Sequence, residues 1–214
     1  MDNRNIASAL LDIQAVRFTP HDPITFRSGI LSPVYVDNRL LSHWPEQWRS
    51  VIHGLRDQIK ARTIEFDIIA GIATGGIPHS SALAYELRMP SVFVRKESKG
   101  YGAQKMIEGG TVEGKRVLLI EDMVTTAGSS LKGVAALREE GAIVADCLCI
   151  TTFGFTVANQ AFEAAEVNLY PLVEFTTIVD EGLRKGIFGD QEYEIIQAWM
   201  NDPQNWTDQH NERN

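Results

Sequence analysis

The sequence predicts an α/β fold built on a central, mostly parallel sheet flanked by helices. Short apolar runs of strand length alternate with segments whose apolar residues recur at helical spacing, which is typical of parallel sheets. Two of the apolar runs end in glycine- and hydroxyl-rich turns that lead into helices, at residues 71–76 and 121–130. Open parallel sheets bind ligands at the carboxyl ends of their strands, so both turns are candidate sites.

Local patterns place the elements along the chain. Residues 3–15 have Ile6, Leu10, Leu11 and Ile13 on one helical face, and residues 45–61 begin with Pro45 and carry an apolar stripe. Residues 26–39 form a turn and a strand-like run, consistent with a hairpin that buries Tyr35. The remaining predicted strands are 66–71, 91–95, 116–121, 143–151 and 167–173, and the remaining predicted helices are 79–88, 129–140, 157–166, 176–185 and 190–200.

Composition limits the classes of function. The chain has 214 residues and no internal linker, so we expect a single domain over residues 1–214. The net charge of −8 argues against a nucleic-acid partner or an acidic membrane surface. No apolar run approaches membrane-spanning length and the N-terminus does not resemble a signal peptide, so we expect a cytoplasmic protein. Cys147 and Cys149 would share one face of a strand, and we interpret them as reduced core residues rather than metal ligands.

The stretch 121–130, EDMVTTAGSS, carries the strongest chemical signal. A buried strand runs into Glu121 and Asp122, and then into a turn of small and hydroxyl residues that opens a helix. Backbone N–H groups at a helix N-terminus suit a phosphate, whereas two carboxylates suit sugar hydroxyls or a hard divalent cation. The stretch therefore describes a sugar-phosphate site. A helix capped by Thr126 or Ser129 is the simpler alternative, but a cap does not require two adjacent acids.

Two nucleotide-binding patterns are not supported. Residues 109–115 fit GxxxxGK, but Arg116 stands where a Walker loop needs Ser or Thr, and the segment precedes a strand instead of following one. The chain contains no GxGxxG pattern, so a nicotinamide-binding fold has no support either.

A cationic segment follows the strand at 91–95. Arg95, Lys96 and Lys99 lead into a polar loop over residues 97–114 that contains five glycines. Such charge runs are usually solvated, but a ligand with several phosphates requires cations as well as backbone donors. We therefore expect residues 97–114 to form a flexible loop that closes over the ligand and excludes water.

Together these motifs resemble a known family. VLLIEDMVTTAGSS is similar to the phosphoribosyl-diphosphate signature of type I phosphoribosyltransferases. FRSGILSPVYVDNR, GIATGGIPHS and RKESKGYG followed by IEGG narrow the likeness to orotate phosphoribosyltransferases, from about residue 5 to the C-terminal helices. The resemblance implies the type I phosphoribosyltransferase fold, with a small N-terminal hood from residues 1–40 that binds the base. It also implies Mg²⁺, synthesis of pyrimidine nucleotides, and a homodimer in which loop residues of one subunit complete the site of the other.

The resemblance also assigns residues by position. Glu121 and Asp122 would hold the ribose hydroxyls, Thr125 to Ser129 the 5′-phosphate, and Arg27, Arg95, Lys96 and Lys99 the diphosphate. Tyr35, Val36 and Thr125 would contact orotate, and Lys99, Asp122 and Glu121 would be catalytic. The full set expected to bind phosphoribosyl diphosphate is Arg27, Thr74, Gly75, Arg95, Lys96, Lys99, Tyr101, Glu121, Asp122, Met123, Val124, Thr125, Thr126, Ala127, Gly128 and Ser129. No specific metal ligand is assigned.

The chain departs from the family pattern at three places. Many members have His at the position of Tyr101, and some have Lys at that of Gly75. Some have an orotate-binding Arg after the strand that ends here near Thr151, but no Arg occurs between Arg138 and Arg184. Backbone groups near Tyr35 and Val36, Thr125 or Arg27 are then the expected partners of the carboxylate. Two alternative functions are transfer to another nucleobase and a regulatory module that binds phosphoribosyl diphosphate without turnover.

Overall fold

A computed structural model describes residues 3–26, 29–96 and 106–213. Within these residues the largest sheet has six strands in the order β10-β9-β8-β5-β6-β7. Neighbouring strands are parallel from β10 to β6, and the short strand β7 pairs antiparallel with β6. The predicted α/β fold with a mostly parallel sheet is therefore confirmed. The strands of this sheet are β5 (Ile68–Ile72), β6 (Ser91–Val94), β7 (Ile107–Glu108), β8 (Arg116–Val124), β9 (Ile143–Thr152) and β10 (Asn168–Glu174).

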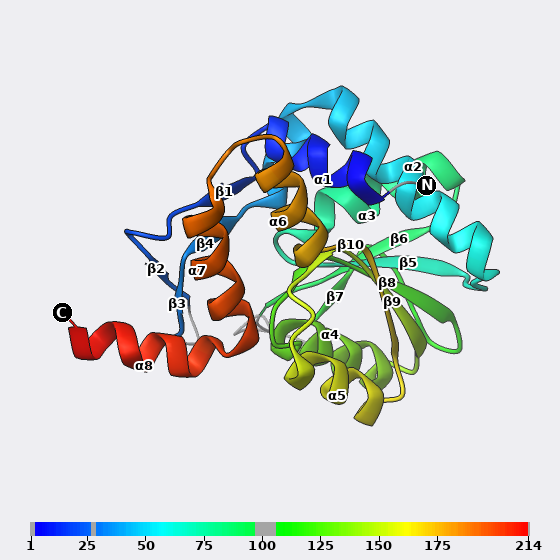
Figure 1. The fold of residues 1–214 in the computed structure, drawn as a ribbon. Coiled ribbons are helices and arrows are strands. Elements are labelled where there is room, and N and C mark those ends of the chain that lie inside the picture. The colour runs from blue at the N-terminus through cyan, green and yellow to red at the C-terminus, as the bar shows by residue number, and fades with distance from the viewer. Residues whose placement is uncertain (1–2, 27–28, 97–105, 214) are drawn as a thin grey trace.

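Helices cover both faces of this sheet, as Figure 1 shows. One face packs against four helices, α1 (Asn3–Asp12), α2 (Pro45–Arg62), α3 (Gly76–Leu87) and α6 (Phe175–Arg184). The other face packs against α4 (Gly128–Glu139) and α5 (Thr156–Ala164). Central strands are buried on both faces, so β5 is a continuous apolar run in which every residue is buried.

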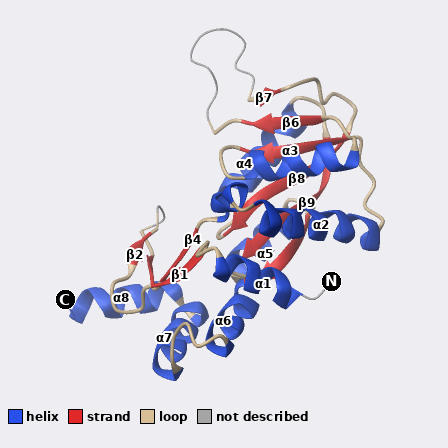
Figure 2. Cartoon of the chain, turned by 90° about the horizontal axis from the view of Figure 1, so that it is seen from above, coloured by secondary structure: helices blue, strands red, loops and turns tan. Residues whose placement is uncertain are grey.

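Two small antiparallel ribbons form what we call the hood, residues 16–37. Strand β1 (Val16–Phe18) pairs with β4 (Val34–Val36), and β2 (Ile24–Thr25) pairs with β3 (Leu31–Ser32). A short 3-10 helix, η1 (Asn38–His43), connects the hood to α2. Figure 2 shows the hood beyond the carboxyl ends of the central strands. This arrangement places it over the edge of the sheet where ligands of parallel sheets bind.

The C-terminal helices α7 (Asp190–Asn201) and α8 (Pro203–Arg213) support the hood. The buried Trp199 donates from Nε1 to the Leu31 carbonyl oxygen over 2.8 Å, and the Leu31 N–H donates to Thr207 Oγ1 over 3.0 Å. The C-terminus therefore fixes a strand of the hood that lies more than 160 residues earlier in the chain.

The predicted elements differ from the structure at several points, including β1, β2 and η1, for which no element was predicted. Helix α8 was not predicted, because its sequence, PQNWTDQHNER, has almost no apolar stripe. Strand β7 lies inside the predicted loop 97–114, where it extends the sheet edge beyond β6. The hairpin expected to bury Tyr35 is also wrong in detail: β4 pairs with the distant β1, and Tyr35 is only half-buried, with the Arg17 guanidinium 4.9 Å from its ring centre. The part of the predicted loop at 97–105 lies outside the described residues.

The cysteines are confirmed as core residues. Cys147 and Cys149 lie in β9, both are completely buried, and neither forms a disulfide. Burial raises the pKa of both thiols well above the usual value, so they stay protonated and inert. Across the described part of the chain, no helix is long and apolar enough to cross a membrane.

Candidate active site

A cavity of about 510 Å³ opens between the hood and the carboxyl ends of the central strands. Its wall comes from the turn after β5, the segment after β6, the end of β8 with the turn that follows, and the hood. The volume lies within the usual range for small-molecule sites, about 300–1,000 Å³. Both turns singled out in the sequence therefore border one space.

The turn between β8 and α4 leaves the N-terminus of the helix open. Ala127 stands at the N-cap with a φ of 66° and provides no side-chain hydrogen bond. The N-cap is thus neither Thr126 nor Ser129, and no side chain forms a capping hydrogen bond; the hydroxyls of Ser129 and Ser130 instead donate to Glu121 Oε2, over 3.3 and 3.2 Å. The alternative of a simple capped helix is therefore wrong. Uncapped N–H groups in a turn of small side chains favour an anion such as a phosphate.

The two adjacent acids have different surroundings. Glu121 is buried, and its Oε1 accepts the Asp122 N–H over 3.1 Å while Oε2 accepts the two serine hydroxyls. Burial, followed by the neighbouring Asp122 carboxylate, raises the pKa of Glu121 well above its usual value. Asp122 is half-buried and lines the cavity. Glu121 thus stabilises the turn through its hydrogen bonds. Asp122 is the more accessible acceptor for a hydroxyl of a bound ligand.

The turn after β5 lies directly against Asp122. A Cβ atom added to Gly75 would overlap both oxygens of the Asp122 carboxylate, so the glycine allows the turn and the acid to approach closely. His79, in the first turn of α3, is fully buried beneath this region, and its Nδ1 accepts from Trp48 Nε1 over 3.0 Å. Burial lowers the pKa of His79 to about 4, against an opposing effect of the Asp122 charge. The imidazole is therefore neutral near pH 7.

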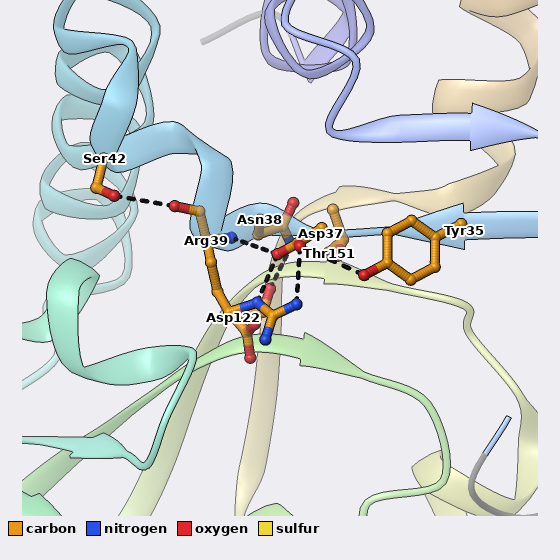
Figure 3. A network of polar contacts seen from close by, with 7 residues as sticks. All are labelled: Tyr35, Asp37, Asn38, Arg39, Ser42, Asp122 and Thr151. Atoms are coloured by element: carbon orange, nitrogen blue, oxygen red, sulfur yellow. Dashed lines mark hydrogen bonds and ion pairs between the residues drawn. The ribbon is translucent and has the colours of Figure 1, made fainter.

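Figure 3 shows how the hood is joined to the end of β8. The buried Asn38 donates from Nδ2 to the Asp122 carbonyl oxygen over 2.7 Å and to Thr151 Oγ1 over 2.8 Å. Beside it, Arg39 makes a bidentate contact with Asp37, from Nε to Oδ1 over 2.6 Å and from Nη2 to Oδ2 over 2.7 Å. These contacts fix the segment after β4 relative to Asp122.

Comparison with known proteins agrees with this geometry. A family model described as a phosphoribosyl transferase domain matches residues 41–168. A protein named orotate phosphoribosyltransferase from Coxiella burnetii is 39% identical over 201 residues, covering 94% of this chain and 96% of the relative. One of the same name from Halalkalibacterium halodurans is 40% identical over 203 residues, with 94% and 97% covered. The chain belongs to the orotate phosphoribosyltransferase family.

Solved structures of the orotate phosphoribosyltransferase family have the same fold. The crystal structure of the enzyme from Aeropyrum pernix matches with a TM-score of 0.75 at 28% identity, over 86% of this chain and 99% of that one. The structure of Leishmania donovani UMP synthase matches with a TM-score of 0.82 at 25% identity, over 94% of this chain but 42% of that longer chain. The type I phosphoribosyltransferase fold expected from the sequence is thus confirmed.

Most of the residues predicted for an orotate phosphoribosyltransferase site lie together. The cavity is lined by Tyr35, Val36, Thr74, Gly75, Lys96 and every residue from Glu121 to Ser129. Arg95 is not part of this wall, and its Nη1 contacts Glu108 Oε1 on β7 over 2.8 Å. Arg27, Lys99 and Tyr101 lie outside the described residues. The ligand-binding roles of all these residues remain predictions.

Several lining residues were missed by the sequence analysis. Asp37 and Arg39 line the cavity next to the predicted base contacts, as do Ile24, Thr25 and Phe26 of the hood. The motif FRSGILSPVYVDNR contains Phe26, Asp37 and Arg39. The residue types in this motif do not show whether a charged side chain lines a cavity or points into solvent. Asn38 was missed because its partners lie 84 and 113 residues away in the chain.

The aromatic stretch after β9 has a structural role. Phe153 is buried and packs against Phe175 with ring centres 4.7 Å apart, and against Trp199 at 5.3 Å. Phe155 stacks on Phe153 at 5.4 Å, and Phe26 of the hood lies 5.9 Å from Phe153. The position where some members have Arg thus joins the hood to the core through an aromatic cluster.

Proposed function

We propose that this protein transfers the 5-phosphoribosyl group from phosphoribosyl diphosphate to orotate, giving orotidine 5′-monophosphate and diphosphate. The observation that supports this most strongly is that three different kinds of group line one cavity. They are an uncapped helix N-terminus, a half-buried acid and a hood strand, which suit the phosphate, the ribose hydroxyls and the base of one ligand. The reaction belongs to the synthesis of pyrimidine nucleotides.

We assign the groups of the substrate as follows. The 5′-phosphate lies at the N-terminus of α4 on the backbone of residues 125–129, and Asp122 accepts hydrogen bonds from the ribose hydroxyls. The turn at Thr74 and Gly75 and the cation of Lys96 face the diphosphate. The ring of orotate lies against Tyr35 and Val36.

The reaction forms a bond from orotate N1 to C1′ of the ribose and breaks the bond from C1′ to the diphosphate oxygen, and the proton on orotate N1 passes to the diphosphate or to water. Positive charge develops at C1′ and negative charge on the leaving diphosphate, so catalysis depends mainly on orientation and on placed charges. The Asp122 carboxylate holds the ribose in place while cations of the chain stabilise the leaving group. No nucleophilic side chain is required, because the base itself attacks.

We also propose that Mg²⁺ takes part. The Asp122 carboxylate is a hard oxygen ligand at the cavity, which suits this ion. The described residues contain no cluster of three or more His, Cys, Asp or Glu side chains that would hold a metal ion by themselves. The residues therefore fit an ion held mostly by substrate oxygens and water, as Mg²⁺ commonly is at phosphate sites. When bound, it would neutralise charge on the departing diphosphate.

A turnover assay tests the function. Wild-type protein with Mg²⁺ and phosphoribosyl diphosphate is mixed separately with orotate, uracil and hypoxanthine, and the change in base absorbance is followed. We expect rapid loss of orotate and little change with the other bases. Preference for uracil or hypoxanthine would assign the chain to transfer to another base. Binding of phosphoribosyl diphosphate without turnover of any base would favour the regulatory alternative.

We further propose a cytoplasmic homodimer in which loop residues of one subunit serve the site of the other. Subunit complementation tests this: Lys99→Ala and Asp122→Asn chains are mixed and allowed to exchange. A heterodimer would then contain one site with both changes and one with neither, so activity should rise above that of each variant alone. If mass spectrometry shows exchange but activity does not rise, Lys99 acts within its own chain.

A further inference from the structure

We propose that Arg39 binds the carboxylate of the pyrimidine base and so determines the preference for orotate over a base without this group. The inference rests on the proposed function and deepens it, because it assigns a partner to the charged group of the base.

A carboxylate enclosed in a cavity requires a charged or hydrogen-bonding partner, because its removal from water is costly. The segment after β9 does not provide a cation, since Phe153 and Phe155 there pack in the aromatic cluster around Trp199. Among the described residues that line the cavity, the cationic side chains are Arg39 and Lys96.

The positions of these two cations differ. In the sheet, β5 lies between β6 and β8. Lys96 follows β6, so it lies at the part of the cavity beside the turn after β5, away from the end of β8. Arg39 lies on the side of the hood, three residues after Val36 and in the segment that Asn38 ties to β8. A base against Tyr35 and Val36 is therefore next to Arg39.

The guanidinium of Arg39 is held in place and retains free donors. A guanidinium has five N–H donors, and Asp37 accepts from Nε and Nη2. No other acceptor for Arg39 occurs among the described hydrogen bonds, so the Nη1 and Nη2 pair remains available for a second bidentate contact. The side chain is 56% exposed, which leaves room for a ligand. Figure 3 shows the Asp37 contact, which orients the guanidinium and lowers the entropic cost of binding.

The local charge favours a carboxylate over diphosphate at this position. Asp37 pairs with Arg39, and the charge of Asp122 also acts on the guanidinium. Because two carboxylates surround this one guanidinium, the site attracts a multiply charged anion such as diphosphate only weakly. A planar carboxylate with a single charge instead matches the free pair of donors in shape.

The test compares two nucleotides that differ in the carboxylate alone. Calorimetry measures the Kd of orotidine 5′-monophosphate and of uridine 5′-monophosphate for wild type, Arg39→Gln and Arg39→Lys. Loss of a charged bidentate contact should weaken orotidine 5′-monophosphate by about 10- to 100-fold in Arg39→Gln, and leave uridine 5′-monophosphate within about twofold. Arg39→Lys should lie between wild type and Arg39→Gln. In turnover, KM for orotate should rise while KM for phosphoribosyl diphosphate stays constant.

Arg62→Gln is the matched control, because it removes the same charge from an exposed side chain that packs over Tyr170, outside the cavity wall. Its affinities should equal those of wild type. Equal weakening of both nucleotides by Arg39→Gln, no weakening of either, or a rise in KM for phosphoribosyl diphosphate alone would overturn the proposal. Failure of the wild-type protein to bind orotidine 5′-monophosphate or to consume orotate would instead reject the proposed function.

Discussion

Replacing Gly75 with alanine tests the consequence of the close approach between the Asp122 carboxylate and the turn after β5. Gly75 has a φ of −68° and a ψ of −37°, which alanine adopts without strain, so the backbone does not oppose the change. The added Cβ would overlap the Asp122 carboxylate. The carboxylate must withdraw by about 1 Å to reach a permitted contact, and a misplacement of this size in a catalytic site costs about 100-fold in rate.

We therefore expect kcat/KM for phosphoribosyl diphosphate to fall about 100-fold in Gly75→Ala, with little change in melting temperature. A double-mutant cycle with Asp122→Ala identifies the cause, because removing the carboxylate removes the overlap. In the Asp122→Ala background, Gly75→Ala should have almost no further effect. Equal losses in both backgrounds would show that the Cβ obstructs the ligand directly, and the explanation through Asp122 would then be wrong.

Four further changes test the site. Asp122→Asn should lower kcat/KM by one to two decades, since a charged hydrogen bond contributes about 1.5–3 kcal/mol, and unchanged kinetics in a folded variant would remove the acid from the mechanism. Asn38→Ala loses two hydrogen bonds of a buried side chain, so the free energy of unfolding measured in urea should fall by about 1–3 kcal/mol. KM for orotate should also rise, and wild-type values of both quantities would refute the role of Asn38 in joining the hood segment to β8. The pKa of His79 is lowered from 6.5 to about 4, so between these pH values the unfolded chain binds a proton that the folded chain does not. About 3 kcal/mol of the free energy of unfolding should therefore be lost as pH falls from 6.5 to 4. His79→Asn keeps an acceptor for Trp48 and should lack this dependence; an identical acid profile would contradict the assignment. The raised pKa of Glu121 predicts the opposite sign for its own contribution, which should fall as pH rises above about 4.5. Glu121→Gln should therefore gain stability relative to wild type with rising pH in thermal melts, and a constant difference would exclude this effect.

The sequence predicted the parts of the site that local patterns determine. A buried strand, two acids and a small-residue turn before a helix are contiguous in the chain, so the end of β8 and the N-terminus of α4 were recognised together. Lys96 was also recognised, because it lies two residues after the end of β6. Arg95 precedes it by one residue yet pairs with Glu108, since the sequence does not show that β7 would place an acid beside it.

Other features depend on contacts between distant residues. Asn38 links two segments through its bonds to Asp122 and Thr151, and Arg39 reaches the cavity wall because of the placement of the hood. Helix α8 is stabilised by its contact with β3 more than by its own apolar pattern, so its sequence gave little helical signal. Tertiary packing thus decides the details of the hood and of the cavity wall that it forms.

A crystal structure with orotidine 5′-monophosphate is the most direct test of the central claim that one cavity holds phosphate, ribose and base in this order. We predict the phosphate at the backbone of residues 125–129, the ribose hydroxyls on Asp122, and the pyrimidine ring against Tyr35 and Val36. A phosphate bound away from the N-terminus of α4, or a pyrimidine ring outside the hood, would contradict the account.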